Sequence, residues 1–185
     1  MKKIPTLFIR EGLHVTEEVT SGCEWVMGGE GFPTYKWDGT CVLIKDDNTM
    51  WKRRQVKPGK PDPEGFELCE EDPNTGKRFG WMPCDRDNPD DEWHWEGFDS
   101  YDCDWIPGTY ELVGPKVQGN PHGFRSHALV LHGEDAVEGL DLSSYQRLRV
   151  SMDDRTGIKD DGFEGVVWYH PDGRMCKLKA KDFQE

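Results

Sequence analysis

Short apolar runs, separated by glycine, proline and charged residues, recur along most of this 185-residue chain. Apolar runs of about four to eight residues are typical of β-strands, whereas amphipathic helices need longer segments with a period near 3.6. The pattern therefore predicts a strand-rich protein with few helices. Strands are predicted at residues 4–9, 40–45, 49–56, 109–113, 127–132, 165–169 and 174–179.

Two segments are predicted to be helical. Residues 20–27 form a short helix, which ends at the two glycines that follow it. Residues 143–152 form a second helix, with Ser143 as its N-cap. The sequence HPDG at 170–173 is a strong turn signal, so the last two strands are predicted to form a hairpin.

The segment 58–107 differs from the rest, because it is rich in Pro, Gly, Asp and Glu and contains Trp81, Trp93 and Trp95. Flexible linkers rarely contain so many tryptophans. We therefore predict an insertion between core strands, ordered by its aromatic side chains rather than by regular secondary structure. Its tryptophans are expected to pack half-buried against the sheet, and its acidic side chains are expected to face water.

Charge is distributed unevenly along the chain. Residues 60–104 contain 15 acidic and 4 basic residues, whereas the remainder contains 21 acidic and 19 basic residues. The net charge of -13 therefore belongs mainly to the insertion. The nearly balanced remainder can still carry a basic groove for nucleic acid, and the sequence KRRQVKPGK at 52–60 is a candidate phosphate grip.

Composition restricts the class of protein. Eight tryptophans and eight phenylalanines argue against disorder, and residues 1–185 suffice for one compact domain. Without a long apolar run or a signal peptide, we expect a cytoplasmic protein that contacts no membrane. The six cysteines form no Cys-x-x-Cys pair, which favours reduced thiols. A zinc site from His94, Cys69, Cys84 and Cys103 is not predicted, because no short ligand pair anchors it.

The sequence Lys-x-Asp-Gly at 36–39 stands directly before an apolar strand. A lysine at a turn is usually a surface residue, but Lys36 also suits a nucleophile at the edge of a pocket. A carboxylate follows downstream in GTYELVG at 108–114, where strand alternation directs Glu111 away from the core face.

Two further elements follow in order. Glu164 precedes a buried strand, and Gly165 next to it permits a close backbone approach. In the last strand, Lys177 and Lys179 project from one face while their neighbours face the other way. Two such ammonium groups repel each other, so they require an anion near them unless this is the solvated face of an edge strand.

The order Lys-x-Asp-Gly, Glu, Glu-Gly-Val-Val, Lys-x-Lys resembles the covalent nucleotidyltransferase superfamily of DNA ligases, RNA ligases and mRNA-capping guanylyltransferases. The motifs KWDGT, YELVGPKVQGNPHG, DGFEGVVW and CKLK are most similar to small 5′-to-3′ RNA ligases, as is HG at 132–133. The segment DPNTGKRFGWMP resembles an insertion of bacterial and phage members. The resemblance covers most of residues 30–181.

This resemblance implies an α+β fold, the adenylation (nucleotidyltransferase) domain, in which two packed antiparallel sheets and a few helices hold the nucleotide. Only six residues follow Lys179, so no OB-fold domain is expected. Lys36 would attack the α-phosphate of ATP to form lysyl-AMP. AMP would pass to an RNA 5′-phosphate, and a 3′-hydroxyl would seal the strand in RNA repair.

The resemblance also implies cofactors and partners. ATP and Mg²⁺ are the expected cofactors, with Mn²⁺ as a substitute, and a monomer acting on RNA with 5′-phosphate and 3′-hydroxyl ends is expected. A DNA ligase or a capping guanylyltransferase of the same superfamily is the alternative enzyme. The alternative outside enzymes is an acidic binding protein whose 60–104 segment mimics nucleic acid or docks a partner.

Site roles follow from the resemblance. Nearby cations would favour the free amine of the nucleophile. Many ligases place an arginine soon after Asp-Gly; here Thr40 and Cys41 follow, so Arg53 or Arg54 is expected to supply the guanidinium, unless both belong to a solvated face. His132 is included as a nucleotide contact, with a buried or turn histidine as the alternative. The expected catalytic residues are Lys36, Asp38, Lys177 and Lys179; the expected nucleotide contacts are Tyr35, Lys36, Gly39, Arg53, Arg54, Glu111, His132, Glu164, Lys177 and Lys179; the expected metal ligands are Glu164 and Glu111.

Overall fold

A computed structural model describes residues 2–102, 104–158 and 162–183, and the chain divides into two compact units. Unit 1 comprises Gly39–His132 and the N-terminal residues up to Lys3. Unit 2 comprises Ile4–Asp38 and Gly133–Glu185. The chain therefore passes from unit 2 to unit 1 inside the Lys-x-Asp-Gly sequence.

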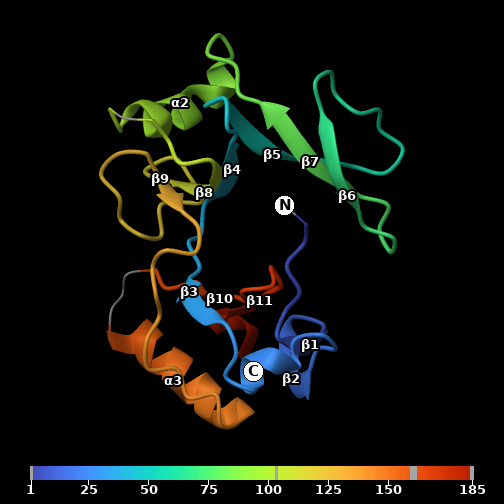
Figure 1. The fold of residues 1–185 in the computed structure, drawn as a ribbon, viewed down its shortest axis with the longest axis vertical. Coiled ribbons are helices and arrows are strands. Elements are labelled where there is room, and N and C mark those ends of the chain that lie inside the picture. Colours follow the sequence, from blue (N-terminus) through green and yellow to red (C-terminus); the bar gives the residue numbers. More distant parts are fainter. Residues whose placement is uncertain (1, 103, 159–161, 184–185) are drawn as a thin grey trace. The chain divides into compact units, whose positions relative to one another are not determined.

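Unit 1 is built on a six-stranded antiparallel sheet with the strand order β6-β7-β5-β4-β8-β9 (Figure 1). Apolar residues of one sheet face, among them Val42, Ile44 and Leu112, form its core, and the aromatic side chains of α2 pack on them. The elements are β4 (Thr40–Ile44), β5 (Met50–Val56), β6 (Glu67–Glu71), β7 (Arg78–Pro83), η1 (Pro89–Asp91), α2 (Glu92–Asp99), β8 (Gly108–Val113) and β9 (Ala128–Leu131).

Unit 2 contains a three-stranded antiparallel sheet, β11-β10-β3, and the hairpin β1-β2 (Figure 1). Its core joins Trp168 and Leu178 of the sheet to Leu148 and Met152 of α3, all fully buried. Burying each such side chain stabilises the fold by roughly 1.5–3 kcal/mol. The elements are β1 (Phe8–Glu11), β2 (His14–Val19), α1 (Glu24–Met27), β3 (Phe32–Tyr35), α3 (Tyr145–Ile158), β10 (Gly165–Tyr169), β11 (Met175–Lys179) and η2 (Ala180–Phe183).

The predicted α+β class, with antiparallel sheets and few helices, is confirmed. The predicted strands at 40–45, 49–56, 109–113 and 127–132 correspond to β4, β5, β8 and β9, and the predicted C-terminal hairpin is β10-β11. None of the described helices has the length and apolar character required to cross a bilayer.

The helix predicted at 143–152 begins two residues later and is capped differently. The hydroxyl of Ser144 accepts a hydrogen bond from the N–H of Arg147 at 3.2 Å, which is the bond an N-cap makes. The hydroxyl of Ser143 instead donates to Asp141. Ser143 was therefore the wrong cap, because two adjacent serines give the sequence no way to choose between them.

Regular structure in the acidic segment 58–107 corrects the prediction of an irregular insertion. It contributes β6, β7 and α2 to unit 1. Glycine and proline obscured β7, but Gly80 is needed there: a Cβ at that position would lie 2.1 Å from the carbonyl oxygen of Glu67 on β6. Trp93 and Trp95 pack partly buried on the sheet, as predicted, whereas Trp81 is more deeply buried than predicted.

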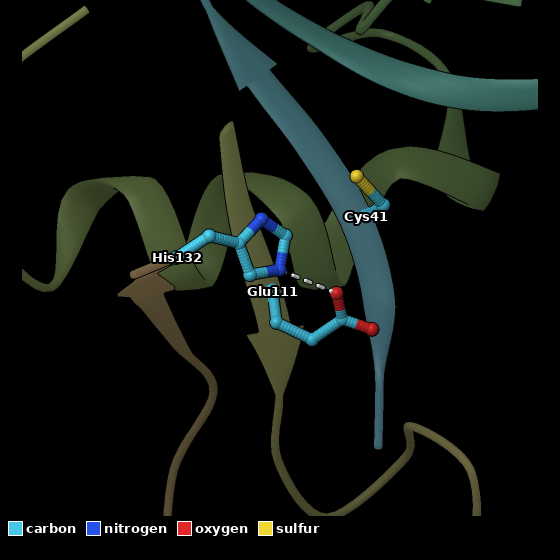
Figure 2. Close-up of side chains that lie close together, drawn as sticks. All are labelled: Cys41, Glu111 and His132. Atoms are coloured by element: carbon cyan, nitrogen blue, oxygen red, sulfur yellow. Dashed lines mark hydrogen bonds and ion pairs between the residues drawn. The ribbon is translucent and has the colours of Figure 1, made fainter. Parts of the chain in front are cut away.

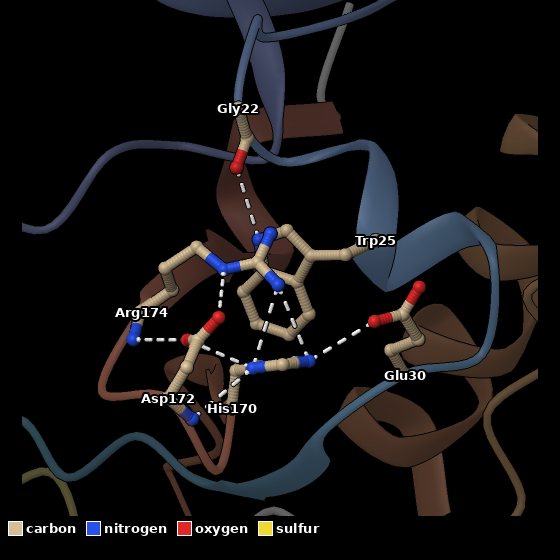
Figure 3. A network of polar contacts seen from close by, with 6 residues as sticks. All are labelled: Gly22, Trp25, Glu30, His170, Asp172 and Arg174. Carbon is tan, nitrogen blue, oxygen red and sulfur yellow. Dashed lines mark hydrogen bonds and ion pairs between the residues drawn. The ribbon is translucent and has the colours of Figure 1, made fainter.

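The hairpin β10-β11 is held by a polar network at its turn (Figure 3). The carboxylate of Asp172 accepts hydrogen bonds from the backbone N–H and the guanidinium of Arg174, and chiefly the backbone bond lowers the pKa of Asp172 to about 2. Nε2 of His170 lies 3.0 Å from Glu30, and the Arg174 guanidinium lies over the ring of Trp25. These contacts fix the turn that precedes the lysine-bearing strand.

Candidate active site

The three-stranded sheet of unit 2 brings Lys36, Glu164 and Lys179 together. Glu164 directly precedes β10, the central strand, while Lys36 follows one neighbouring strand, β3, and Lys179 ends the other, β11. The backbone N–H of Lys36 donates to the carbonyl of Gly165 at 2.9 Å, and Gly165 is paired with Lys179. Strand pairing alone therefore aligns the three side chains.

Glu164 is the counter-ion of both lysines. Its two carboxylate oxygens form ion pairs, one with the Lys36 ammonium and the other with the Lys179 ammonium. Burial raises the pKa of Glu164, but the attraction of Lys36 and hydrogen bonds from both ammonium groups outweigh burial, so the net shift lowers this pKa. The Glu164 side chain is only 6% exposed, and the lowered pKa keeps its carboxylate ionised at neutral pH.

Lys177 completes the lysine cluster, which we define as Lys36, Lys177 and Lys179 around Glu164. Cys176 and Leu178 are fully buried in the core of unit 2, so alternation places Lys177 with Lys179 on the other face, as predicted. Burial, followed by the charges of Lys36 and Lys179, lowers the pKa of Lys177 to about 8. The predicted anion among the lysines is Glu164.

The outer edge of β11 is not a solvated edge. The N–H of Leu7 donates to the carbonyl of Lys177, and the N–H of Lys177 donates to the carbonyl of Pro5. Together with the parallel bridge between Thr6 and Lys177, these bonds cover the strand. The face that carries Lys177 and Lys179 is half-buried rather than fully solvated. The predicted strand at 4–9 is regular only from Phe8 onward.

We expect Lys177→Met to stabilise the protein at pH 7 by about 2 kcal/mol, because the folded state holds this ammonium below its ordinary pKa of 10.5. In the wild type, stability recovers as the pH rises from about 8 towards 10.5, since the folded state releases the Lys177 proton before the unfolded chain does. The stability that Lys177→Met gains over the wild type should therefore shrink as the pH rises. Urea denaturation at pH 7 and 10, with the exposed Lys181→Met as control, measures this difference. A less stable Lys177→Met protein at pH 7 would contradict the expectation.

The residues around Lys36 are anchored within unit 2. The N–H of Tyr35 donates to the carbonyl of Asp135 at 2.7 Å, and the indole N–H of Trp37 donates to the Asp135 carboxylate at 3.0 Å. The ring of Tyr35 packs edge-on against Phe163. Asp38 is half-buried at the end of this segment. Asp135, which the sequence did not indicate, thus anchors the backbone of Tyr35 and the side chain of Trp37, the two residues that flank the candidate nucleophile.

A second cluster lies in unit 1 and joins Glu111, His132 and Cys41 (Figure 2). One carboxylate oxygen of Glu111 accepts from the N–H of Gly39 at 3.0 Å, and the other lies 2.9 Å from Nε2 of His132. Nδ1 of His132 lies 3.0 Å from the hydroxyl of Thr109. Glu111 is therefore fixed from both sides, and through Gly39 it holds the last residue of the Lys-x-Asp-Gly sequence.

Gly39 cannot be replaced without moving the backbone. A Cβ at this position would lie 2.2 Å from the carbonyl oxygen of Leu112 and 2.9 Å from Cγ of Glu111. We expect Gly39→Ala to destabilise the protein by about 2–4 kcal/mol, because backbone on a paired strand must shift. The matched control is Gly108→Ala, whose Cβ would meet Leu131 at an ordinary 3.6 Å. Equal thermal midpoints for the two variants would contradict this expectation.

The faces of the six-stranded sheet separate the two candidate arginines. Pairing of Cys41 with Glu111 and of Leu43 with Trp51 places these residues on one face, and alternation along β5 adds Arg53 to it. Arg54 projects from the opposite face and is exposed. Arg53 therefore shares a face with Glu111, and Arg54 does not.

The structure brings the predicted site residues together in two groups. Lys36, Glu164, Lys177 and Lys179 form one group in unit 2, and Gly39, Glu111 and His132 form the other in unit 1. Cys41 and Thr109 were missed. Thr109 alternates with Glu111 along β8, which was a usable signal, whereas Cys41 meets Glu111 only through the pairing of β4 with β8. Among the described residues, Cys41, Glu111 and His132 also place ligand-type atoms within 4.8 Å of one another.

Comparisons with known proteins add independent information. The chain is similar to proteins named RNA ligase 1. It is 23% identical over 215 positions to RNA ligase 1 of Pongo abelii, an alignment that covers 79% of this chain and 65% of that protein. The corresponding values for RNA ligase 1 of Danio rerio are 23% over 213 positions, 78% and 65%.

Sequence identity is higher over a shorter stretch of the chain. RNA ligase 1 of Mus musculus is 32% identical over 75 residues, which cover 38% of this chain and 22% of that protein. The chain spans about 65% of the length of the first two relatives. No protein-family profile matches the chain. The similarities support a relationship to RNA ligases.

Proposed function

We propose that this chain is an ATP-dependent RNA ligase of the covalent nucleotidyltransferase superfamily, with Lys36 as the nucleophile. The observation that carries the proposal is the lysine cluster: Lys36 is held on a buried carboxylate beside Lys177 and Lys179. Similarity to proteins named RNA ligase 1 supports the substrate class. We further propose that residues 1–185 act as a single nucleotidyltransferase domain in a cytoplasmic monomer.

In the proposed first step, the Lys36 ammonium releases a proton to solvent and its amine attacks the α-phosphorus of ATP. A nitrogen–phosphorus bond forms, the bond to the bridging oxygen breaks, and pyrophosphate leaves with the electron pair. The attacking nitrogen then releases a second proton to solvent, which gives the phosphoramidate. Glu164 orients the Lys36 side chain, while Lys177 and Lys179 stabilise the negative charge that the α-phosphate oxygens develop. Arg53, rather than Arg54, is the proposed guanidinium contact, because it shares the Glu111 face.

Magnesium would enter with the ATP phosphates and would neutralise the charge on the departing pyrophosphate. Carboxylate oxygens can accept hydrogen bonds from the waters that this hard ion keeps in its coordination shell. Both oxygens of Glu164 already bond to ammonium groups, so Glu164 can hold such a water only when one lysine contact transfers to phosphate. Glu111 has one oxygen on the Gly39 N–H and one on His132. Glu164 and Glu111 remain our candidate metal ligands, and Mn²⁺ is the expected substitute for Mg²⁺.

The later steps use RNA with 5′-phosphate and 3′-hydroxyl ends. The AMP group transfers from Lys36 to the 5′-phosphate, which restores the lysine amine. The 3′-hydroxyl then attacks the phosphorus of the 5′-phosphate and releases its proton to solvent. A phosphodiester bond forms, the bond to the AMP oxygen breaks, and AMP leaves with the electron pair. We propose that Asp38 orients the lysine segment or the 3′-hydroxyl. Tyr35 and His132 are proposed to contact the nucleotide.

Incubation with α-labelled ATP and, separately, α-labelled GTP tests the proposal. Label from ATP should become covalently attached to the protein, and the labelled protein should seal 5′-phosphate RNA. Label from GTP would indicate a capping guanylyltransferase, and sealing of DNA alone would indicate a DNA ligase. Absence of label from both nucleotides would favour a non-catalytic binding protein.

A further inference from the structure

Cys84, Asp91 and His94 meet in unit 1, on the α2 side of the six-stranded sheet. Cys84 directly follows β7, Asp91 ends η1, and His94 lies in the first turn of α2. The ligand-type atoms of the three side chains lie within 4.8 Å of one another. They are distinct from the lysine cluster and from the cluster around Glu111.

Both ring nitrogens of His94 are buried and lack a hydrogen-bond partner among the described residues. The His94 side chain as a whole is 11% exposed. A buried nitrogen that lacks such a bond costs roughly 1–3 kcal/mol, so this arrangement needs a reason. Nδ1 of His94 lies 3.9 Å from Oδ1 of Asp91, too far for a hydrogen bond. Two ligands that are each about 2 Å from one ion lie roughly 3–4 Å apart.

Asp91 is the anion of this group, and it contradicts the expectation that the acids of the insertion face water. It is fully buried, one oxygen accepts from the N–H of Asp85 at 3.0 Å, and the other forms an ion pair with Lys52. A buried carboxylate requires a cation beside it. In this structure the Lys52 ammonium is that cation, at the oxygen nearest to His94.

The side chains of this group match the donors that a borderline-soft metal selects. Burial lowers the pKa of His94 and so keeps its imidazole neutral, the form that ligates metals. Burial and the charge of Asp91 raise the pKa of Cys84 to about 12, so the thiol is protonated without a metal. A thiolate, an imidazole nitrogen and a carboxylate oxygen together favour Zn²⁺ over Mg²⁺ or Ca²⁺.

We propose that Cys84, Asp91 and His94 bind a zinc ion that stabilises the fold, with a water molecule as its fourth ligand. Zinc would displace the Cys84 proton to solvent and would take the place of the Lys52 ammonium on Asp91. The site would tie the end of β7 to η1 and to the first turn of α2, so zinc binding should stabilise unit 1. The proposal does not depend on the ligase activity. Cys69 is not required, and Cys103, a candidate in the sequence, lies outside the described residues.

Cobalt and zinc titrations of the full, chelator-treated chain test the site. The wild type should bind one equivalent of Co²⁺ with a thiolate-to-cobalt charge-transfer band, and zinc should abolish the band and raise the thermal midpoint. Cys84→Ala should lack the band. Cys176→Ala, which removes a buried thiol of unit 2, and Cys41→Ala, which removes the thiol beside Glu111, should retain it. A wild type without the band, or a band that Cys84→Ala retains, would overturn the proposal.

Lys52→Met provides a second test that does not depend on whether Cys84→Ala folds. Without zinc, this variant should be less stable than the wild type, because Asp91 loses its counter-ion. It should bind zinc roughly tenfold more tightly, since no ammonium competes for the carboxylate. Zinc affinity that is unchanged or weaker in Lys52→Met would exclude Asp91 as a ligand and overturn the three-residue site.

Discussion

Lys36→Ala is expected to abolish covalent labelling by α-labelled ATP and the sealing of RNA with an ordinary 5′-phosphate. The amine of Lys36 is the only atom of this residue that can form the phosphoramidate, and alanine has no substitute for it. Sealing of RNA that already carries a 5′-adenylate should persist, because that step bypasses the lysine adduct. Gel analysis of labelled protein and of both RNA substrates measures the three outcomes.

The matched control is Lys181→Ala, which removes an exposed lysine two residues beyond the lysine cluster. It should label and seal as the wild type does. Labelling that survives in Lys36→Ala would identify another residue as the nucleophile. Loss of both sealing reactions together, with the fold intact, would show that Lys36 acts in the final step as well.

Glu164→Gln is expected to combine a loss of stability with a loss of labelling. The amide keeps the shape of the side chain but removes the negative charge from between Lys36 and Lys179, with Lys177 close by. Removing one partner of a buried ion pair costs about 3–5 kcal/mol. Because both lysines are partly exposed, we expect about 3 kcal/mol. Labelling should be roughly a hundredfold slower, since Lys36, the proposed nucleophile, loses its orientation.

The pH dependence separates this ion-pair effect from a general packing defect. The pKa of Glu164 is lowered in the folded protein, so its contribution is present above its ordinary pKa of 4.5. That contribution is lost as the pH falls through the depressed folded-state pKa. The stability difference from Glu164→Gln should thus be constant near neutrality and shrink in acid. Urea denaturation at several pH values, with the exposed Glu138→Gln as control, measures it. A difference that does not change with pH would contradict the ion-pair explanation.

The alternation of residues along single strands was sufficient to predict much of the candidate site. Because Cys176 and Leu178 are apolar, the opposite face of β11 had to carry Lys177 and Lys179. Likewise Glu111 could be assigned to the face away from Tyr110 and Leu112. These inferences need only the period of a strand, which the sequence displays directly.

Contacts between distant segments could not be predicted in this way. The roles of Asp135 and of His132 depend on which strands pair and in which register, and register is a property of the whole sheet. The burial of Asp91 was missed for the same reason, since its partner Lys52 belongs to a strand 39 residues earlier. Local composition suggested a solvated acidic segment, and tertiary pairing overrode it.

The sheet that carries the lysine cluster has a consequence for how the protein is made. Its hydrogen bonds join residues far apart in the chain: the hydroxyl of Thr34 donates to the carbonyl of Val167 across 133 positions. Closing a loop of this length costs entropy before any contact repays it, so such pairings form late and slowly. A nascent chain can complete the lysine cluster only after β11 has left the ribosome. On the proposed function, competence to react with ATP should therefore appear only after β11 has been synthesised, even where unit 1 has already folded.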